Sequence, residues 1–245
     1  MLLFYHFGRY LLFLKSLFSK PEAWHIYVKR TFAEMTSLGV NSIVIVAIIS
    51  VFSGAVTTVQ TAYQLVAGWI SKTIIGSIVS DSVILELAPT ITCLVLAGKI
   101  GSSIASEIGT MRVSEQIDAM EVMGINSAGY LVLPKIIAGV IMVPLLIILA
   151  MFLGIYGGLF AGSMTGILAP EQFIEGARST FREFNVMFSM LKATTFGFII
   201  TSVASFHGYY TEGGALEVGQ SSTNAVVYSS VLILFADYLI AQLFL

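Results

Sequence analysis

The stretch that decides the fold lies at residues 136–161 and reads IIAGVIMVPLLIILAMFLGIYGGLFA. It contains no charged residue, and a helix of this length reaches across the roughly 30 Å hydrocarbon core of a bilayer. Pro134 and Pro144 predict kinks or tilt in this helix. Four other apolar stretches are also long enough to cross. We therefore predict five transmembrane helices, at residues 40–65, 82–104, 132–161, 186–207 and 223–243.

The composition excludes most soluble classes of protein. Of the 245 residues, 57% are hydrophobic and only 11% are charged, whereas a soluble domain carries about 25% charged residues. A disordered chain is excluded for the same reason. The net charge of −2 gives no basic surface for nucleic acid. The single cysteine excludes an internal disulfide framework, and the three histidines show no metal-ligand spacing. The predicted fold class is an all-α polytopic membrane protein without a metal site.

Residues 1–39 are a different kind of segment, because aromatic and basic side chains mix here without an uninterrupted apolar core. This mixture predicts N-terminal amphipathic helices that lie in the membrane interface, with their cations at the lipid headgroups. Pro21 is expected to divide the segment into two helices. A sixth span is the alternative. The predicted organisation is an interfacial region at 1–39 followed by a five-span domain at 40–245.

The basic residues predict the orientation of the chain. Short loops rich in Lys and Arg stay in the cytoplasm, and the five spans divide these residues eight to three in favour of the N-terminal side. The N-terminus is therefore predicted to be cytoplasmic. The eight are Arg9, Lys15, Lys20, Lys29, Arg30, Lys99, Arg112 and Lys135, and the three are Lys72, Arg178 and Arg182.

The segment 105–124, predicted to be cytoplasmic, carries most of the charge in the middle of the chain. Val113, Ile117 and Met120 recur at helical spacing, and Gly124 predicts the C-terminal stop of a helix. A short amphipathic helix with this spacing would suit a groove on a soluble partner. The pattern alone favours the alternative, a solvated connector between two spans.

Two blocks of sequence resemble the MlaE-type permease family, the membrane subunits of ABC transporters that work with mammalian-cell-entry (MCE) proteins. The first block contains Glu86-Leu-Ala-Pro-Thr-Ile-Thr, Ala97-Gly-Lys-Ile-Gly, Ala105-Ser-Glu-Ile-Gly, Met111-Arg-Val and Glu115-Gln-Ile-Asp. The second contains Gly208-Tyr, Gly213-Gly-Ala, Val218-Gly and Thr223-Asn-Ala-Val-Val. Members of the family often have a basic residue before the glutamate of the first motif. This chain has Leu85 there, so no headgroup contact is carried over to that position.

The resemblance implies a set of partners. Such a permease acts as a homodimer beneath a hexamer of MCE subunits, in a bacterial inner membrane, with a dimer of a cytoplasmic ABC ATPase bound from below. Its cargo is lipid, chiefly phospholipid, moved between the inner and outer membranes. The segment at 105–124 would be the coupling helix seated in the ATPase. The coupling residues implied are Glu107, Gly109, Met111, Arg112, Glu115, Gln116 and Asp118.

The residues support this division of labour independently. The sequence has no Gly-x-x-x-x-Gly-Lys-Ser/Thr motif to hold nucleotide phosphates. The chain is therefore predicted to be non-catalytic and to carry no cofactor, and ATP with Mg²⁺ would bind the partner ATPase.

One face of the first span is polar. Ser50, Ser53, Thr57, Gln60 and Gln64 are spaced by three or four residues, which places them on one side of a helix. Such a stripe faces protein or a water-filled cavity rather than lipid. The functional hypothesis is a cavity for the polar end of a lipid, and the alternative is a helix–helix or dimer contact. The predicted cavity residues are Ser53, Thr57, Gln60, Tyr63, Gln64 and Glu86.

Three ionisable residues, Glu86, Lys192 and Asp237, fall inside the predicted spans at similar depth. A charge at the bilayer centre costs about 2.5–3.5 kcal/mol, which favours pairing, and Lys192 with Asp237 is the predicted intramembrane pair. The pair either fixes helix register or lines a headgroup cavity or gate. A secondary transporter that uses the three residues as an ion relay is the alternative function. An intramembrane lipid-modifying enzyme is a third, for which the sequence lacks a catalytic constellation.

Overall fold

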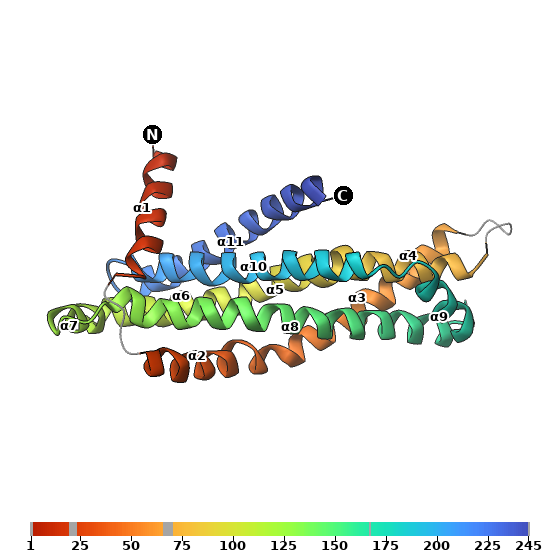
Figure 1. The fold of residues 1–245 in the computed structure, drawn as a ribbon, viewed down its shortest axis with the longest axis horizontal. Coiled ribbons are helices and arrows are strands. Elements are labelled where there is room, and N and C mark those ends of the chain that lie inside the picture. The colour runs from red at the N-terminus through yellow and green to blue at the C-terminus, as the bar shows by residue number, and fades with distance from the viewer. Residues whose placement is uncertain (1, 20–23, 66–70, 167, 245) are drawn as a thin grey trace. The chain divides into compact units, whose positions relative to one another are not determined.

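The structure is a computed structural model of the chain, and it describes residues 2–19, 24–65, 71–166 and 168–244. Within these ranges every regular element is a helix (Figure 1). Five helical runs are long and apolar enough to cross a membrane. The predicted all-α class and the predicted five spans are therefore confirmed. The runs are Trp24–Gln64, Thr73–Val113, Ser127–Met164, Glu183–Tyr209 and Ala215–Phe244.

Each run is longer than its predicted span, because the helices continue past the apolar stretches into more polar residues. The first run joins α2 (Trp24–Leu38) to α3 (Ile43–Gln64) through a short 3₁₀ turn, η1 (Val40–Ser42). The second run contains two π-helical stretches, η2 and η3. Its elements are α4 (Thr73–Ser82), η2 (Val83–Ile91), α5 (Thr92–Leu96), η3 (Ala97–Gly101) and α6 (Ser102–Val113).

The third run is a single helix, α8 (Ser127–Met164). Neither Pro134 nor Pro144 ends it, and the kinks or tilt expected at these prolines stay a prediction. Pro134 has no N–H to donate to the carbonyl oxygen of Tyr130, and Arg30 donates to that oxygen instead, at 3.1 Å. The remaining elements are α7 (Gln116–Val122), α9 (Pro170–Ser179), α10 (Glu183–Tyr209) and α11 (Ala215–Phe244).

The contacts divide the chain into two compact units, and several of the long helices contribute residues to both. The first unit comprises residues 1–41, 94–142 and 195–238, and the second comprises residues 42–93, 143–194 and 239–245.

In the first unit, the C-terminal end of α1 (Leu2–Ser16) lies at the C-terminal part of α10 (Figure 1), and the two helices pack through aromatic rings. Phe13 is buried, and its ring centre lies 5.7 Å from that of Phe206 and 5.4 Å from that of Tyr209. The Tyr10 hydroxyl lies 2.7 Å from that of Ser202. Burial raises the pKa of Tyr10, while this hydrogen bond acts in the opposite direction. A helix of 15 residues is about 22 Å long and falls short of a bilayer core, and the interfacial placement of residues 1–39 stays a prediction. The break expected at Pro21 lies outside the described residues.

In the second unit, glycines bring helix backbones together. A Cβ atom at Gly54 on α3 would lie 1.8 Å from the carbonyl oxygen of Gly154 on α8. A Cβ atom at Gly176 on α9 would lie 1.9 Å from the carbonyl oxygen of Thr73 at the start of α4. Pro170 occupies the first position of α9, where its missing N–H costs nothing and its fixed φ favours the helix. These contacts fix α3 on α8 and α9 on α4 at distances that only glycine permits.

Candidate functional site

A proline interrupts the regular hydrogen bonding of the second run. Residues 83–91 are π-helical, and Pro89 lies among them. Proline has no N–H, so in a regular α-helix the carbonyl of Leu85, four positions earlier, would lose its donor. A polar backbone group without a partner is costly inside a membrane. π-helical turns are rare and occur frequently at functional sites.

The side chain of Lys192, on α10, supplies a donor at this point. Its ammonium lies 3.2 Å from the carbonyl oxygen of Leu85 and 3.1 Å from Oε2 of Glu86. It also lies 4.9 Å from the centre of the Phe188 ring, within the range of a cation–π interaction. Lys192 is 1% exposed, whereas the side chain of Glu86 is 52% exposed. The cation is thus held inside the unit, while its carboxylate partner remains accessible from outside the chain.

The structure gives Lys192 a partner that the sequence analysis did not pair with it, Glu86. Similar depth identified Glu86, Lys192 and Asp237 as a group, but depth does not determine which side chains face each other. Asp237 is buried on the face of α11 that also buries Ser229 and Ile233. Lys192 and Asp237 belong to different units, so their pairing stays a prediction. The signal that would have identified Glu86 is Pro89, whose missing N–H calls for a donor near residue 85.

The polar stripe on α3 is divided between internal and exposed groups. The Ser50 hydroxyl donates to the carbonyl oxygen of Val46 at 2.7 Å, and the Thr57 hydroxyl donates to that of Ser53 at 2.8 Å. Such bonds satisfy hydroxyl groups within their own helix. The other predicted cavity residues on this helix are exposed on its surface, and they are Gln60, Tyr63 and Gln64.

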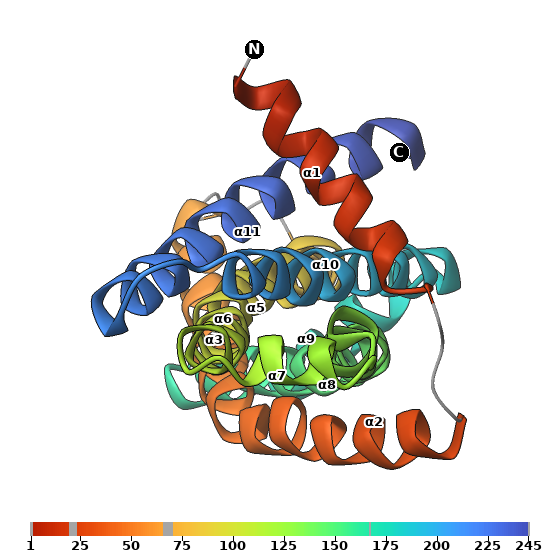
Figure 2. The ribbon, with the colours of Figure 1, turned by 90° about the vertical axis from the view of Figure 1, so that its left-hand side faces the viewer.

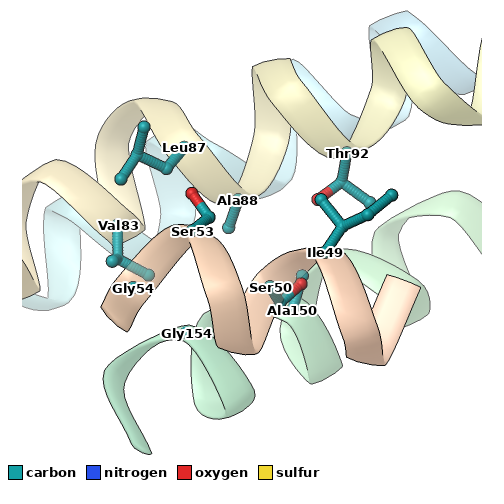
Figure 3. Close-up of a pocket in the computed structure, with 10 residues that line it drawn as sticks. All are labelled: Ile49, Ser50, Ser53, Gly54, Val83, Leu87, Ala88, Thr92, Ala150 and Gly154. Carbon is teal, nitrogen blue, oxygen red and sulfur yellow. The ribbon is translucent and has the colours of Figure 1, made fainter. Parts of the chain in front are cut away.

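A small cavity lies between α3, α8 and η2 in the second unit (Figure 3). Its volume is about 10 Å³, which is room for one water molecule. Ser53 belongs to both the predicted cavity set and this lining, and Figure 3 shows its hydroxyl directed toward η2. A lipid does not fit here. The full lining is Ile49, Ser50, Ser53, Gly54, Val83, Leu87, Ala88, Thr92, Ala150 and Gly154.

The segment 105–124, predicted as one helix, forms parts of two helices. The helix α6 continues the second run to Val113, and α7 occupies Gln116–Val122. Between them Glu115 adopts a left-handed conformation, with φ of 59°. Such a residue costs about 1–2 kcal/mol when it carries a side chain. The regular spacing of the apolar residues continues across the break, which is why periodicity did not detect it. Figure 2 shows α7 at the end nearest the viewer, between α6 and α8.

The predicted stop at Gly124 is confirmed. Gly124 has φ of 80°, and its N–H donates to the carbonyl oxygen of Glu121 at 2.9 Å. The N–H of Ile125 donates to the carbonyl oxygen of Met120 at 3.0 Å. These two bonds form a Schellman motif, in which glycine takes the left-handed position after the helix.

The residues implied in coupling have different surroundings. Arg112 Nη1 lies 2.7 Å from Asp118 Oδ1, so this ion pair joins α6 to α7 across the break. Glu107 bonds a buried lysine within the chain, Lys135. A Cβ atom at Gly109 would lie 3.3 Å from the side chains of Thr211 and Val218. The remaining residues are partly or fully exposed, and they are Met111, Glu115 and Gln116.

A second set of contacts that holds α7 was missed from the sequence. The hydroxyl groups of Ser127 and Tyr209 each donate to Oε1 of Glu121 at 2.9 Å, and the two hydroxyl oxygens lie 2.8 Å apart. The start of α8 and the end of α10 are thereby tied to α7. A signal was present, because Ser127 follows a helix stop by three residues and Tyr209 belongs to the second block of conspicuous sequence.

Comparison with known proteins gives matches over most of the chain. The model of the family Permease MlaE matches residues 31–243. A probable ABC transporter permease protein of Rickettsia bellii is 35% identical over 239 residues, which are 94% of this chain and 87% of the relative. A probable ABC transporter permease protein of Synechocystis is 36% identical over 215 residues, covering 88% and 81%. The intermembrane phospholipid transport system permease protein MlaE of Haemophilus influenzae is 30% identical over 211 residues, covering 86% and 80%. With this match the chain belongs to the MlaE permease family.

Proposed function

We propose that this chain is the membrane-embedded, non-catalytic subunit of an ABC transporter that moves phospholipid between the inner and outer membranes of a bacterial envelope. The observation that carries the proposal is the family match over residues 31–243. One of the relatives is named for intermembrane phospholipid transport. The five apolar runs provide the membrane domain that such a subunit requires.

The proposed location is the inner membrane, with the N-terminus in the cytoplasm. The distribution of basic residues supports this orientation, because the described cations of the N-terminal side all belong to the first unit, while Lys72, Arg178 and Arg182 belong to the second. Two of the counted cations are held within the chain. Lys135 is buried in α8 and Lys99 donates to the carbonyl oxygen of Asn41. The remaining cations of the first unit still outnumber those of the second.

The proposed partners are a second copy of this chain, an MCE hexamer and a dimer of an ABC ATPase that holds ATP and Mg²⁺. The small size of the cavity beside η2 supports the homodimer, because this cavity has room only for water and a lipid has to bind elsewhere. The half-exposed Glu86 and the exposed Gln60 and Gln64 also support it, since polar groups in spans face protein or water rather than lipid. A second copy would complete a chamber that is large enough for a lipid.

The proposed mechanism follows from the path of the second run. The ATPase supplies work when it binds and hydrolyses ATP. The helix α7 receives it, and the Arg112–Asp118 ion pair passes a displacement to α6. The chain continues without interruption from α6 back to η2, where Glu86 presents an accessible carboxylate beside the buried ammonium of Lys192. These two charges would bind the polar end of a lipid, with the acyl chains along apolar helix surfaces.

The test is a purification of the native complex under mild conditions, followed by mass spectrometry of its proteins and lipids. The complex is then placed in lipid vesicles, and transfer of fluorescent phospholipid to acceptor vesicles is measured with and without ATP. We expect an ABC ATPase and an MCE protein to co-purify and transfer to require ATP. A matched control carries an ATPase without its P-loop lysine and should transfer no lipid.

The alternative, a secondary transporter, gives a different result in the same assay. Transfer would then depend on an ion gradient, would stop when an ionophore is added, and would proceed without an ATPase. That outcome would overturn the proposal. Retained transfer without any partner would likewise overturn it, in favour of an activity that this chain performs alone.

A further inference from the structure

A second buried cation lies in the first unit, apart from the Lys192 site. Lys135, on α8, is 2% exposed. Its ammonium lies 2.7 Å from Oε1 of Glu34, on α2, and 2.8 Å from Oε2 of Glu107, on α6. Three helices that are far apart in the sequence therefore meet at one ammonium group.

The burial of the three groups is unequal. The side chain of Glu34 is 21% exposed and that of Glu107 is 52% exposed, so water reaches both carboxylates but barely reaches the ammonium of Lys135. A buried ion pair contributes little net stability, because desolvation opposes the attraction, but it fixes the geometry of its partners. The arrangement therefore favours a role in positioning helices over a role in stabilising the fold.

The two carboxylates belong to helices that lead in different directions. Glu107 lies on α6, which ends at Val113 and connects to α7. Glu34 lies on α2, which continues through η1 into α3, the helix with the polar stripe. The ammonium of Lys135 thus joins the helix that precedes α7 to the run that contains α3.

We propose that Lys135, Glu34 and Glu107 form a positioning cluster that transmits displacement of α6 to the α2–α3 run. The inference rests on the proposed function, because it assigns to the cluster the step between ATP hydrolysis by the partner and movement of the membrane helices. The cluster touches neither nucleotide nor lipid. Its effect is on the amount of lipid moved for each ATP hydrolysed.

The test uses the full complex in lipid vesicles and measures ATP hydrolysis and phospholipid transfer in the same preparation. Lys135→Met keeps most of the side-chain volume and removes the charge. We expect it to lower the transfer-to-hydrolysis ratio by roughly three- to tenfold, while ATP hydrolysis continues. Lys135→Arg keeps the charge and should restore most of the ratio. Lys29→Met, which removes an exposed cation from the same helix as Glu34, is the matched control and should leave the ratio unchanged.

Two further variants keep the proposal testable if Lys135→Met fails to fold. Glu34→Gln and Glu107→Gln each leave the ammonium with one carboxylate. If both act through the same cation, their effects on the ratio should not be additive in the double variant. A purely structural role would lower the yield of complex and both rates together, and an unchanged ratio in these variants would overturn the inference while the proposed function stands. Absence of ATP-dependent transfer in the wild-type complex would instead refute the proposed function.

Discussion

Replacing Pro89 with alanine should weaken the dependence of the fold on Lys192. The alanine N–H lets this π-helical segment return to α-helical bonding, in which residue 89 donates to the carbonyl of Leu85, so that carbonyl no longer needs the ammonium 3.2 Å away. In the wild-type background, Lys192→Met removes a hydrogen bond to a charged donor and leaves a carbonyl group without it. Such losses cost about 1–3 kcal/mol in soluble proteins and less between membrane helices, where measured values average about 0.6 kcal/mol. We expect about 1–2 kcal/mol for Lys192→Met alone, and roughly 1 kcal/mol less when Pro89→Ala is present.

The assay is a double-mutant cycle on the purified protein in detergent, with unfolding followed in increasing sodium dodecyl sulfate or by temperature. For a chain of this length 1 kcal/mol corresponds to a change in Tm of about 2–4 °C. Glu86→Gln serves as the control, because it alters the other contact of the ammonium and its effect should not depend on Pro89. Free energies that add to within about 0.5 kcal/mol for Pro89→Ala and Lys192→Met would refute the idea that the lysine compensates for the proline.

Three other substitutions test separate features. Glu115→Gly removes the side chain from a left-handed residue and should raise stability by up to about 1 kcal/mol; an unchanged Tm would show that no strain is stored there. Gly54→Ala would bring a methyl group within 1.8 Å of a backbone oxygen on α8 and should cost about 1–3 kcal/mol, seen as a lower Tm and a poorer size-exclusion profile. Gly98→Ala, whose new Cβ would have no atom of another helix within 4 Å, is the control, and an equal loss in both variants would contradict the close-packing explanation. Asp118→Arg turns the surface ion pair between Asp118 and Arg112 into a repulsion and should uncouple ATP hydrolysis from lipid transfer. The Tm should change little, since exposed ion pairs contribute about 0–1 kcal/mol. The exchange of both charges should recover coupling, and hydrolysis that remains lipid-stimulated in Asp118→Arg alone would argue against a role for this pair.

The sequence was sufficient for the number and type of the spanning helices. Apolar length determines whether a segment can cross a bilayer, and this property depends on composition within one window. The end of the helix at Gly124 could also be predicted from the sequence, because a left-handed position after a helix favours glycine so strongly. Other helix ends were harder to predict, since α6 and α11 extend into polar residues that lie outside the apolar stretches.

The contacts inside the candidate site were harder to predict. Depth along a helix placed Lys192 near other charged groups, but its contact with Glu86 depends on the direction of side chains on two helices. The break at Glu115 was missed because glutamate gives no local signal for a left-handed conformation. Lys135 was counted as a loop cation, and only the structure shows that Glu34 and Glu107, distant in sequence, surround it.

The π-helical geometry of η2 and η3 has a consequence for how this region is studied. A π-helical turn contains more residues than an α-helical turn, because its hydrogen bonds join each residue to the fifth along rather than the fourth. Residues three apart within 83–91 or 97–101 therefore do not share a side of the helix as they do in an α-helix, whereas residues four or five apart do. A cysteine-accessibility or tryptophan scan across this stretch has to be fitted with a longer repeat. A helical wheel drawn at 100° per residue would assign lipid-facing and protein-facing positions to the wrong sides.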